Sequence, residues 1–177
     1  MIPISLSISG FLSYRDPVEI DFTHFDLACI SGSNGAGKSS ILDAITWVLF
    51  GQARKRDESL INTHSESAEV TLVYAYEGNR YRVMRANPRG KTGVLEFHIA
   101  RDTDPTAIHG NWKPLTEHTT RATQARIEET LRMYYDTIIN AAFFLQGKAD
   151  QFTPQRPSDR KRILANILGL ETWETFR

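Results

Sequence analysis

Residues 32–39 read Gly-Ser-Asn-Gly-Ala-Gly-Lys-Ser, which matches the phosphate-binding pattern G-x-x-x-x-G-K-[ST] at every fixed position. Its glycines allow successive backbone N–H groups to point at one anion. Lys38 adds a positive charge for the β- and γ-phosphates, and Ser39 offers a hydroxyl to Mg²⁺. The stretch therefore predicts a loop that binds a nucleotide through its phosphates and is followed by a helix aimed at them.

The flanking residues agree with this prediction. The run 25–30 is short and mostly apolar, which predicts a buried strand with Cys29 as a small core residue. Behind the loop, apolar residues recur at helical spacing and Gly51 stands where such a helix would end: Ile41, Ala44, Ile45, Val48 and Leu49. Strand, glycine loop and helix thus follow in the required order.

The composition describes an ordinary globular chain. Its 177 residues suggest one domain, with 41% hydrophobic and 24% charged residues. No apolar run approaches the length of a membrane span, and a single cysteine argues against disulfides, so we expect a cytoplasmic protein with no membrane partner. The formal net charge is zero, so bulk electrostatics do not indicate a nucleic-acid partner.

The rest of the chain has a different pattern of apolar and turn residues from the P-loop unit. Turns are expected at 77–79 and 87–90, a loop with one helical turn at 52–67, and a loop at 101–118. Helices are expected at 120–133, with Ile127 and Leu131 facing inward, and from Pro157 onward. Alternating or apolar runs predict strands at 2–9, 18–22, 70–76, 80–86, 94–100 and 138–145. The prediction is an α/β fold with an added antiparallel β meander.

One expected feature of a P-loop ATPase is missing. Such enzymes hold Mg²⁺ with an acidic residue at the end of an apolar strand. The nearest candidates are 73–77, which reads as a hairpin strand, and 94–96, which is too short. A last helical stripe stops at Arg177. The chain therefore reads as part of a larger protein that binds phosphates without its own catalytic base.

Several motifs point to one family. They are Gly10-Phe11-Leu12-Ser13-Tyr14, the P-loop with its extension Ser40-Ile41-Leu42-Asp43-Ala44-Ile45, Leu49-Phe50-Gly51, Phe143-Phe144-Leu145-Gln146-Gly147 and Asp159-Arg160-Lys161-Arg162. Over essentially its whole length the chain resembles the N-terminal ATPase segment of SbcC-type DNA double-strand-break repair ATPases, relatives of the SMC proteins. The resemblance implies the N-terminal lobe of an ABC-type ATPase head over 1–168, with a mixed sheet around the P-loop helix. The start of a coiled-coil helix would occupy 169–177.

The resemblance also implies site residues. Gln146 is similar to the Q-loop glutamine, which reaches Mg²⁺ and the γ-phosphate, so Lys38 and Gln146 are the expected catalytic residues and Ser39 and Gln146 the expected Mg²⁺ ligands. Some relatives have a basic residue where Leu12 stands here, and whether Arg15 replaces it is open. The expected ATP-binding residues are Ser33, Asn34, Gly35, Ala36, Gly37, Lys38, Ser39, Ser40, Asn62, Thr63 and Gln146.

The implied function is that of half an ATPase head. In such proteins the signature, acidic and switch-histidine motifs lie on a distant C-terminal segment, so this chain alone is expected to be inactive. The implied partners are that C-terminal half, a second copy joined by ATP, an SbcD-type nuclease and double-stranded DNA, at the nucleoid. Two alternatives are an SMC-type chromosome-organising head and a small self-contained P-loop kinase or GTPase.

A local excess of positive charge suggests where DNA binds. Between 78 and 101 the sole acidic residue is Glu96, against Arg80, Arg82, Arg85, Arg89, Lys91 and Arg101. Arg85, Arg89 and Lys91 surround the turn at 88–90, which can project side chains into a groove. The alternative is a solvated sheet face without a ligand.

Overall fold

The strands of the chain form one antiparallel sheet in the order β2-β1-β3-β4-β5-β6. The computed structural model describes residues 1–25, 27–55, 57–101, 110–135, 138, 156 and 158. These fall into two units, Met1–Leu131 and Arg132–Arg177, and every named helix and strand belongs to the first. The elements are β1 (Ile2–Ser9), β2 (Val18–Asp21), α1 (Lys38–Phe50), the 3₁₀ helix η1 (Asp57–Leu60), β3 (Ser67–Tyr76), β4 (Asn79–Pro88), β5 (Val94–Ala100), β6 (Trp112–Pro114) and α2 (Thr120–Leu131).

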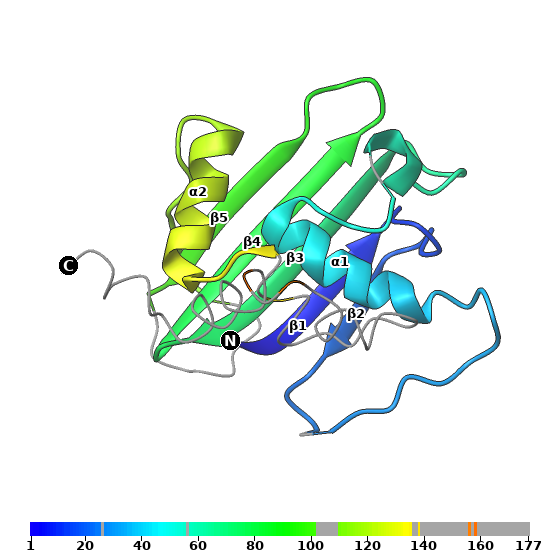
Figure 1. Cartoon of the computed structure of the whole chain (residues 1–177), viewed down its shortest axis with the longest axis horizontal. Coiled ribbons are helices and arrows are strands. Elements are labelled where there is room, and N and C mark those ends of the chain that lie inside the picture. Colours follow the sequence, from blue (N-terminus) through cyan, green and yellow to red (C-terminus); the bar gives the residue numbers. More distant parts are fainter. Residues whose placement is uncertain are drawn as a thin grey trace. The chain divides into compact units, whose positions relative to one another are not determined.

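Alternation along the strands gives the sheet one apolar face. The register pairs Leu6 with Leu72, Leu72 with Val83, and Val83 with Phe97, so one row of apolar side chains crosses four strands. All four are fully buried. Each such side chain contributes about 1.5–3 kcal/mol of hydrophobic stabilisation. Figure 1 shows α1 across the middle of this face and α2 beside β5.

The P-loop helix is fixed firmly at its C-terminal end. Gly51 takes a left-handed conformation with φ of 68° and donates its N–H to the carbonyl of Trp47 at 2.8 Å. Arg85 on β4 donates from Nε to the carbonyl oxygen of Val48 at 3.2 Å. Gln124 on α2 donates to the carbonyl oxygen of Leu49 at 2.9 Å. Carbonyls at the end of a helix have no partner within it, so these groups from two other elements tie α1 to the sheet and to α2.

Much of the predicted secondary structure is confirmed. The α/β class, the meander with its turns, a short helical turn within 52–67, and Gly51 at the end of the P-loop helix all appear. Strand β5 has the predicted bounds, and Ile127 and Leu131 of α2 are fully buried. Every strand pairing among the described residues is antiparallel, so the parallel part of the expected mixed sheet is not among them.

The predicted buried strand at 25–30 is wrong. Its described residues, Phe25 and 27–30, form no strand and are exposed, and Cys29 is exposed as well. An apolar strand needs a neighbour on which to form hydrogen bonds, and no described strand pairs with this segment. Figure 1 shows the chain between β2 and α1 as a wide loop away from the sheet.

Other predictions concern residues outside the described part. They are Gln146, the coiled-coil start at 169–177, and all but one residue each of the strand at 138–145 and the helix from Pro157. Of those two residues, Ser158 is helical as predicted, whereas Ile138 is buried and helical, so the predicted strand does not begin there. No described helix is long and apolar enough to cross a membrane.

Candidate nucleotide site

The predicted P-loop has the backbone conformation that its glycines allow. Gly32, Gly35 and Gly37 all have positive φ, at 152°, 87° and 90°. The N–H of Ala36 donates to the carbonyl oxygen of Ser33 at 3.2 Å, which closes a tight turn inside the loop. Side chains with a Cβ rarely adopt these angles, so the glycines are needed for this loop shape.

Lys38 lies inside its own loop. Its Nζ donates to the carbonyl oxygens of Gly32 at 2.7 Å and Ser33 at 2.8 Å. An ammonium group has three donors, so these two bonds leave a third for another acceptor. The positive charge is thereby held at the loop, where phosphate oxygens would bind.

The start of α1 favours an anion. The helix begins at Lys38, Gly37 provides no side-chain cap, and the first turn of this fully described helix contains no acidic residue. The N-terminus of a helix carries partial positive charge and N–H groups without partners in the helix. A lysine there opposes the helix dipole, a local conflict that an anionic ligand would remove. The adjacent Ser39 is exposed, whereas Ser40 is buried.

The turn Gly10–Tyr14 contacts the end of the P-loop and the first turn of α1. The Tyr14 hydroxyl reaches the carbonyl oxygen of Gly37 at 3.5 Å, and the Ser13 and Ser40 hydroxyl oxygens lie 3.4 Å apart. Burial raises the pKa of the Tyr14 hydroxyl, so it remains a donor at neutral pH. A Cβ on Gly37 would lie 3.1 Å from the Cβ of Ser13 and 3.3 Å from the Tyr14 ring. The last glycine of the P-loop is therefore also needed for close packing.

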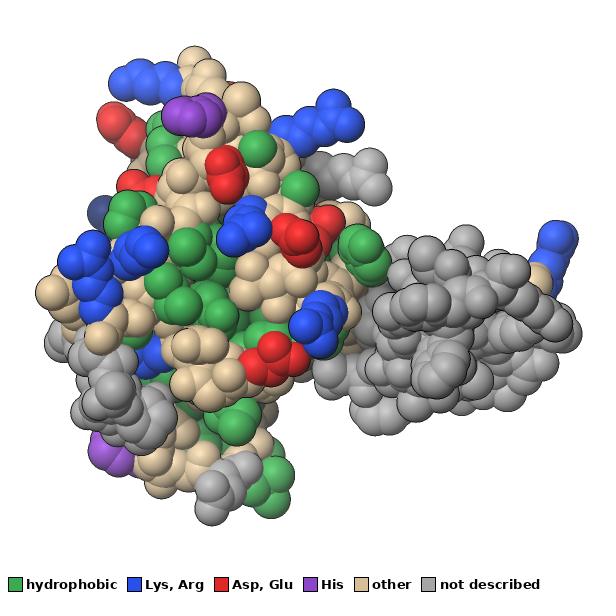
Figure 2. Space-filling model, turned by 90° about the vertical axis from the view of Figure 1, so that its left-hand side faces the viewer, with side chains coloured by type: hydrophobic (Ala, Val, Ile, Leu, Met, Phe, Trp, Pro, Cys, Tyr) green, Lys and Arg blue, Asp and Glu red, His purple; other side chains and the backbone are tan. Residues whose placement is uncertain are grey.

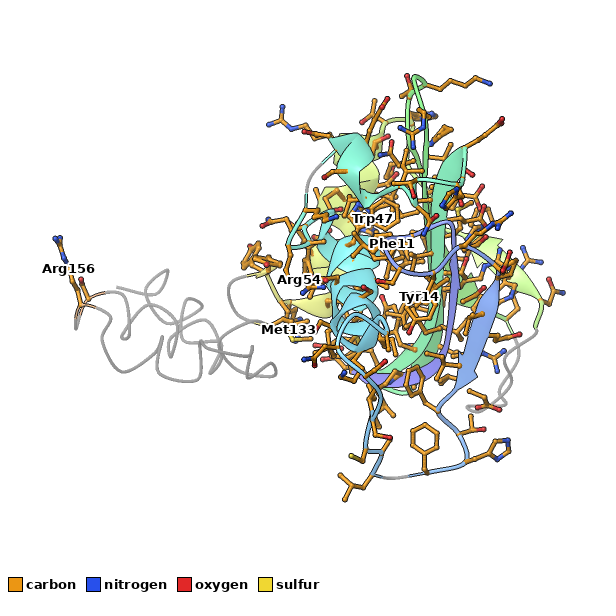
Figure 3. The ribbon with its side chains drawn as sticks, turned by 90° about the vertical axis from the view of Figure 1, so that its right-hand side faces the viewer. Phe11, Tyr14, Trp47, Arg54, Met133 and Arg156 are labelled. Carbon is orange, nitrogen blue, oxygen red and sulfur yellow. The ribbon has the colours of Figure 1, made fainter. Side chains whose placement is uncertain are left out.

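The start of this turn is anchored in the core. Gly10 has φ of 60°, and a Cβ there would lie 1.9 Å from the carbonyl oxygen of Ser67. Phe11 is fully buried, and its ring centroid lies 5.1 Å from that of Trp47 on α1. Figure 3 shows these two rings between α1 and the sheet. The motif Gly10-Phe11-Leu12-Ser13-Tyr14 thus joins the sheet to the P-loop helix.

The sequence also predicts Asn62, Thr63 and Gln146 as nucleotide-binding residues and leaves Arg15 open. Those that the structure describes form no hydrogen bond or ion pair with the P-loop. Asn62 donates from Nδ2 to the carbonyl oxygen of Leu12 at 2.7 Å, and its Oδ1 accepts the N–H of His64 at 3.0 Å. Thr63 is exposed on the following turn. Arg15 is exposed, with Nε 4.0 Å from Asp16 Oδ1, and Gln146 lies outside the described residues.

Sequence reasoning missed one polar pair on the P-loop helix. Asp43 is buried, with 6% of its surface exposed, and its carboxylate accepts from both the backbone N–H and Nε of Arg54. The pair holds the chain after α1 against the helix. An acidic residue inside an apolar helical pattern was the available signal, since a buried carboxylate requires a partner.

The three residues predicted to bind DNA lie in different environments, since Arg85 is largely buried and Arg89 and Lys91 are exposed. Arg85 donates to Val48 and, through a second nitrogen, to Oε1 of Gln124, and burial lowers its pKa to about 10 against the opposing effect of Glu128. It is therefore not the projecting side chain that the prediction required. Arg89 and Lys91 are exposed at the turn between β4 and β5, beside Glu58 of η1. Glu58 accepts the N–H of Gly90 at 2.9 Å and lies 3.5 Å from Arg89.

On the side of the molecule that carries α2, the described residues present charges of both signs. Figure 2 shows described Lys and Arg side chains interspersed with Asp and Glu side chains around a hydrophobic centre. Such a surface does not favour a phosphate backbone, in contrast with the exposed cations of the β4–β5 turn.

Comparisons with known proteins agree with this geometry. The AAA domain family matches residues 5–172. The SbcC component of the SbcCD nuclease of Deinococcus radiodurans is 29% identical over 174 residues, which cover 96% of this chain and 19% of the relative. A probable DNA double-strand break repair Rad50 ATPase of Aquifex aeolicus is 30% identical over 182 residues, with 100% of this chain and 17% of the relative covered. This chain thus spans about a fifth of the length of these relatives.

A solved structure shares the fold. The recombination mediator protein RecF-ATP aligns with a TM-score of 0.53 over 93% of this chain and 37% of its own length, at 14% identity. This likeness concerns the fold alone. The match over residues 5–172, together with the curated relatives, shows that the chain belongs to the AAA domain family as an SbcC/Rad50-type N-terminal ATPase segment.

Proposed function

We propose that this chain is the ATP-binding half of a DNA-repair ATPase head. The observation that carries the proposal is the P-loop itself. Its three glycines have positive φ, the Lys38 ammonium is hydrogen-bonded to the loop, and the helix that follows has no side-chain cap at its start. These groups fit a polyphosphate, because they combine a cation, backbone donors and the positive end of a helix in one place. Relatives named as DNA double-strand break repair ATPases support the choice of ATP as the ligand.

Mg²⁺ would be held partly by this chain. Ser39 is exposed in the first turn of α1, directly behind Lys38, where its hydroxyl can serve as one ligand. Gln146 is proposed as a second ligand and as the contact that links the γ-phosphate to the rest of the head. The ion would neutralise phosphate charge, while Lys38 and the loop amides orient the phosphates.

The complete active site would require more than this chain. No cluster of three His, Cys, Asp or Glu residues that could bind a metal occurs among the described residues. We place the acidic, signature and switch-histidine motifs on a C-terminal half and on a second copy of the protein, as the similarity to SbcC-type ATPases implies. ATP would join two heads, and their closure would regulate an SbcD-type nuclease.

The DNA contact is proposed at Arg89 and Lys91. Both are exposed on the turn after β4, and the ion pair of Arg89 with Glu58 is an exposed one that a phosphate can replace at little cost. Arg85 is left out because it caps α1.

The test of nucleotide binding is Lys38→Ala, with Lys113→Ala as the matched control because Lys113 is exposed on β6. Mg²⁺-ATP at 100 times its dissociation constant should stabilise the parent protein by about 2.7 kcal/mol in a thermal-shift series. The control should behave like the parent, and Lys38→Ala should lose most of this stabilisation. Equal stabilisation of all three proteins would refute the site.

A further inference from the structure

We propose that Asn62 is a positioning residue that keeps the P-loop in shape through the Gly10–Tyr14 turn, and not a ligand of the nucleotide. The inference rests on the proposed nucleotide binding and deepens it. Its starting point is the side-chain amide of Asn62, whose nitrogen and oxygen each already have a hydrogen-bond partner within the protein. Nδ2 donates to the carbonyl oxygen of Leu12, and Oδ1 accepts the N–H of His64.

The segment before His64 clamps the turn by three hydrogen bonds. The N–H of Leu12 donates to the carbonyl oxygen of Leu60 at 2.7 Å, and the N–H of Asn62 donates to that of Gly10 at 2.8 Å. The third bond is the one from Asn62 Nδ2 to Leu12. Among these three, the last alone comes from a side chain and can be removed by substitution.

The clamped turn is conformationally unfavourable on its own. Leu12 has φ of 48°, in the left-handed region that residues with a Cβ rarely adopt. Such a conformation persists where the surroundings hold it in place, and a single residue of this kind costs about 1–3 kcal/mol. Asn62 binds the carbonyl of this same residue, so its amide is placed to stabilise the strained peptide.

The turn transmits its position directly to the phosphate loop. Tyr14 contacts the carbonyl of Gly37, and Ser13 contacts Ser40, at the buried side of the α1 start. If the turn relaxes, these two contacts no longer fix the Gly37 peptide or the first helical turn. The donors for phosphate would then be less well oriented, and affinity would fall although no ligand contact is removed.

The experiment compares variants of the intact protein by equilibrium affinity for Mg²⁺-ATP and for inorganic triphosphate with Mg²⁺. Asn62→Asp keeps the size and the acceptor for His64 but places an oxygen opposite the Leu12 carbonyl. Tyr14→Phe removes only the hydroxyl that reaches Gly37. Asn87→Ala is the control, because the Asn87 amide donates at 3.4 Å to Asp57, outside the clamp. Thermal unfolding without ligand records the effect of each substitution on stability.

A positioning role predicts that Asn62→Asp weakens ATP and triphosphate equally, by about tenfold, the equivalent of one hydrogen bond. Tyr14→Phe should weaken both ligands in the same direction, and the double variant should lose less than the product of the two single effects. A substitution that merely lowers stability would leave the affinity of the folded protein unchanged and would show no such coupling.

Two results would overturn the inference. The first is that Asn62→Asp and Tyr14→Phe both bind the two ligands with the affinity of the parent. The second is that Asn62→Asp loses ATP binding but still binds triphosphate, which would indicate that Asn62 contacts the nucleoside directly. Tyr14→Phe supplies the test alone if Asn62→Asp does not fold. Lys38→Ala distinguishes failure of the Asn62 inference from failure of the proposed function. If this variant still binds triphosphate as the parent does, the proposed nucleotide site itself is refuted.

Discussion

The Nε of Arg85 donates to the carbonyl oxygen of Val48 at 3.2 Å, so an arginine of β4 caps the C-terminal end of the P-loop helix. Its guanidinium carbon also lies 5.9 Å from the centre of the Trp47 ring. A cation at this end of a helix is favoured by the helix dipole and satisfies carbonyls that lack partners within the helix. The residue therefore belongs to the machinery that positions the site.

Arg85→Ala should destabilise the protein by about 2 kcal/mol, because it leaves partly buried acceptors on Val48 and Gln124 without their donor. Arg85→Lys should recover only part of this loss, since an ammonium cannot bond to both acceptors with fork geometry. Urea unfolding measures both variants, with Arg89→Ala as the exposed control. A stability of Arg85→Ala equal to that of the control would mean that the cap contributes nothing.

Reversal of the charges at the turn tests the DNA proposal. The double variant Arg89→Glu, Lys91→Glu should weaken duplex binding by the intact protein and lower the slope of log affinity against log salt by about two. Glu58→Gln should act in the opposite direction, since it releases Arg89 from its ion pair. The control is Arg126→Glu on α2, whose charge faces Glu129 at 3.4 Å. If affinity and slope stay at the parent values in the double variant, DNA binds elsewhere.

His98 should make the stability of the fold depend on pH. Burial lowers the pKa of this imidazole, Arg82 lowers it further and Glu96 opposes both. A base whose pKa is lower in the folded state is neutral there while the unfolded chain still binds a proton. Stability should therefore fall as pH decreases from about 6.5 toward the folded-state pKa and be unaffected above that range.

The measurement is the urea midpoint from about pH 5 to 7.5 for the parent and for His98→Gln, a range that brackets the ordinary imidazole pKa. The variant should lose this part of the pH dependence. The exposed His24, near Asp21, serves as the control through His24→Gln. An unchanged slope in His98→Gln would assign the pH dependence to other groups.

Sequence patterns predict those elements whose stability is local. Strand β5 has the predicted bounds because Val94 to Ala100 alternates between two turn signals, and Leu95 and Phe97 are buried as that pattern requires. The P-loop is equally local, since its glycines and Lys38 act within one short stretch of sequence. Strand β6 was missed because three residues ending in Pro114 carry too little periodicity for a prediction.

Contacts between distant segments could not be predicted. Arg85 lies in an alternating strand, where an arginine normally faces solvent, and nothing local reveals that Val48 and Gln124 meet it. The role of Asn62 depends in the same way on Leu12, fifty positions earlier. The strand expected at 25–30 fails for a related reason, because apolar character does not supply the hydrogen-bonding neighbour that a strand needs.

The exposed segment before the P-loop leads to a prediction about solubility. Phe25, Leu27 and Ile30 are 41%, 92% and 49% exposed, directly before the loop that would bind ATP. Exposed apolar side chains in a row favour association, so this chain alone should aggregate readily. A C-terminal half that covers the segment should raise the soluble yield on co-expression, and an unchanged yield would mean that the segment is not what drives aggregation.

The proposed two-part arrangement would also govern catalysis. Phosphoryl transfer needs Mg²⁺ held from two sides, an oriented water and further charge stabilisation at the γ-phosphate, whereas this chain supplies the P-loop, Ser39 and, by proposal, Gln146. The chain alone should therefore bind ATP weakly and hydrolyse almost none. Added C-terminal half should restore turnover, which should rise more steeply than linearly with protein concentration because each site would lie between two heads. Steady-state ATPase assays over a concentration series measure this. Robust turnover by the chain alone, first order in protein, would instead identify a self-sufficient NTPase.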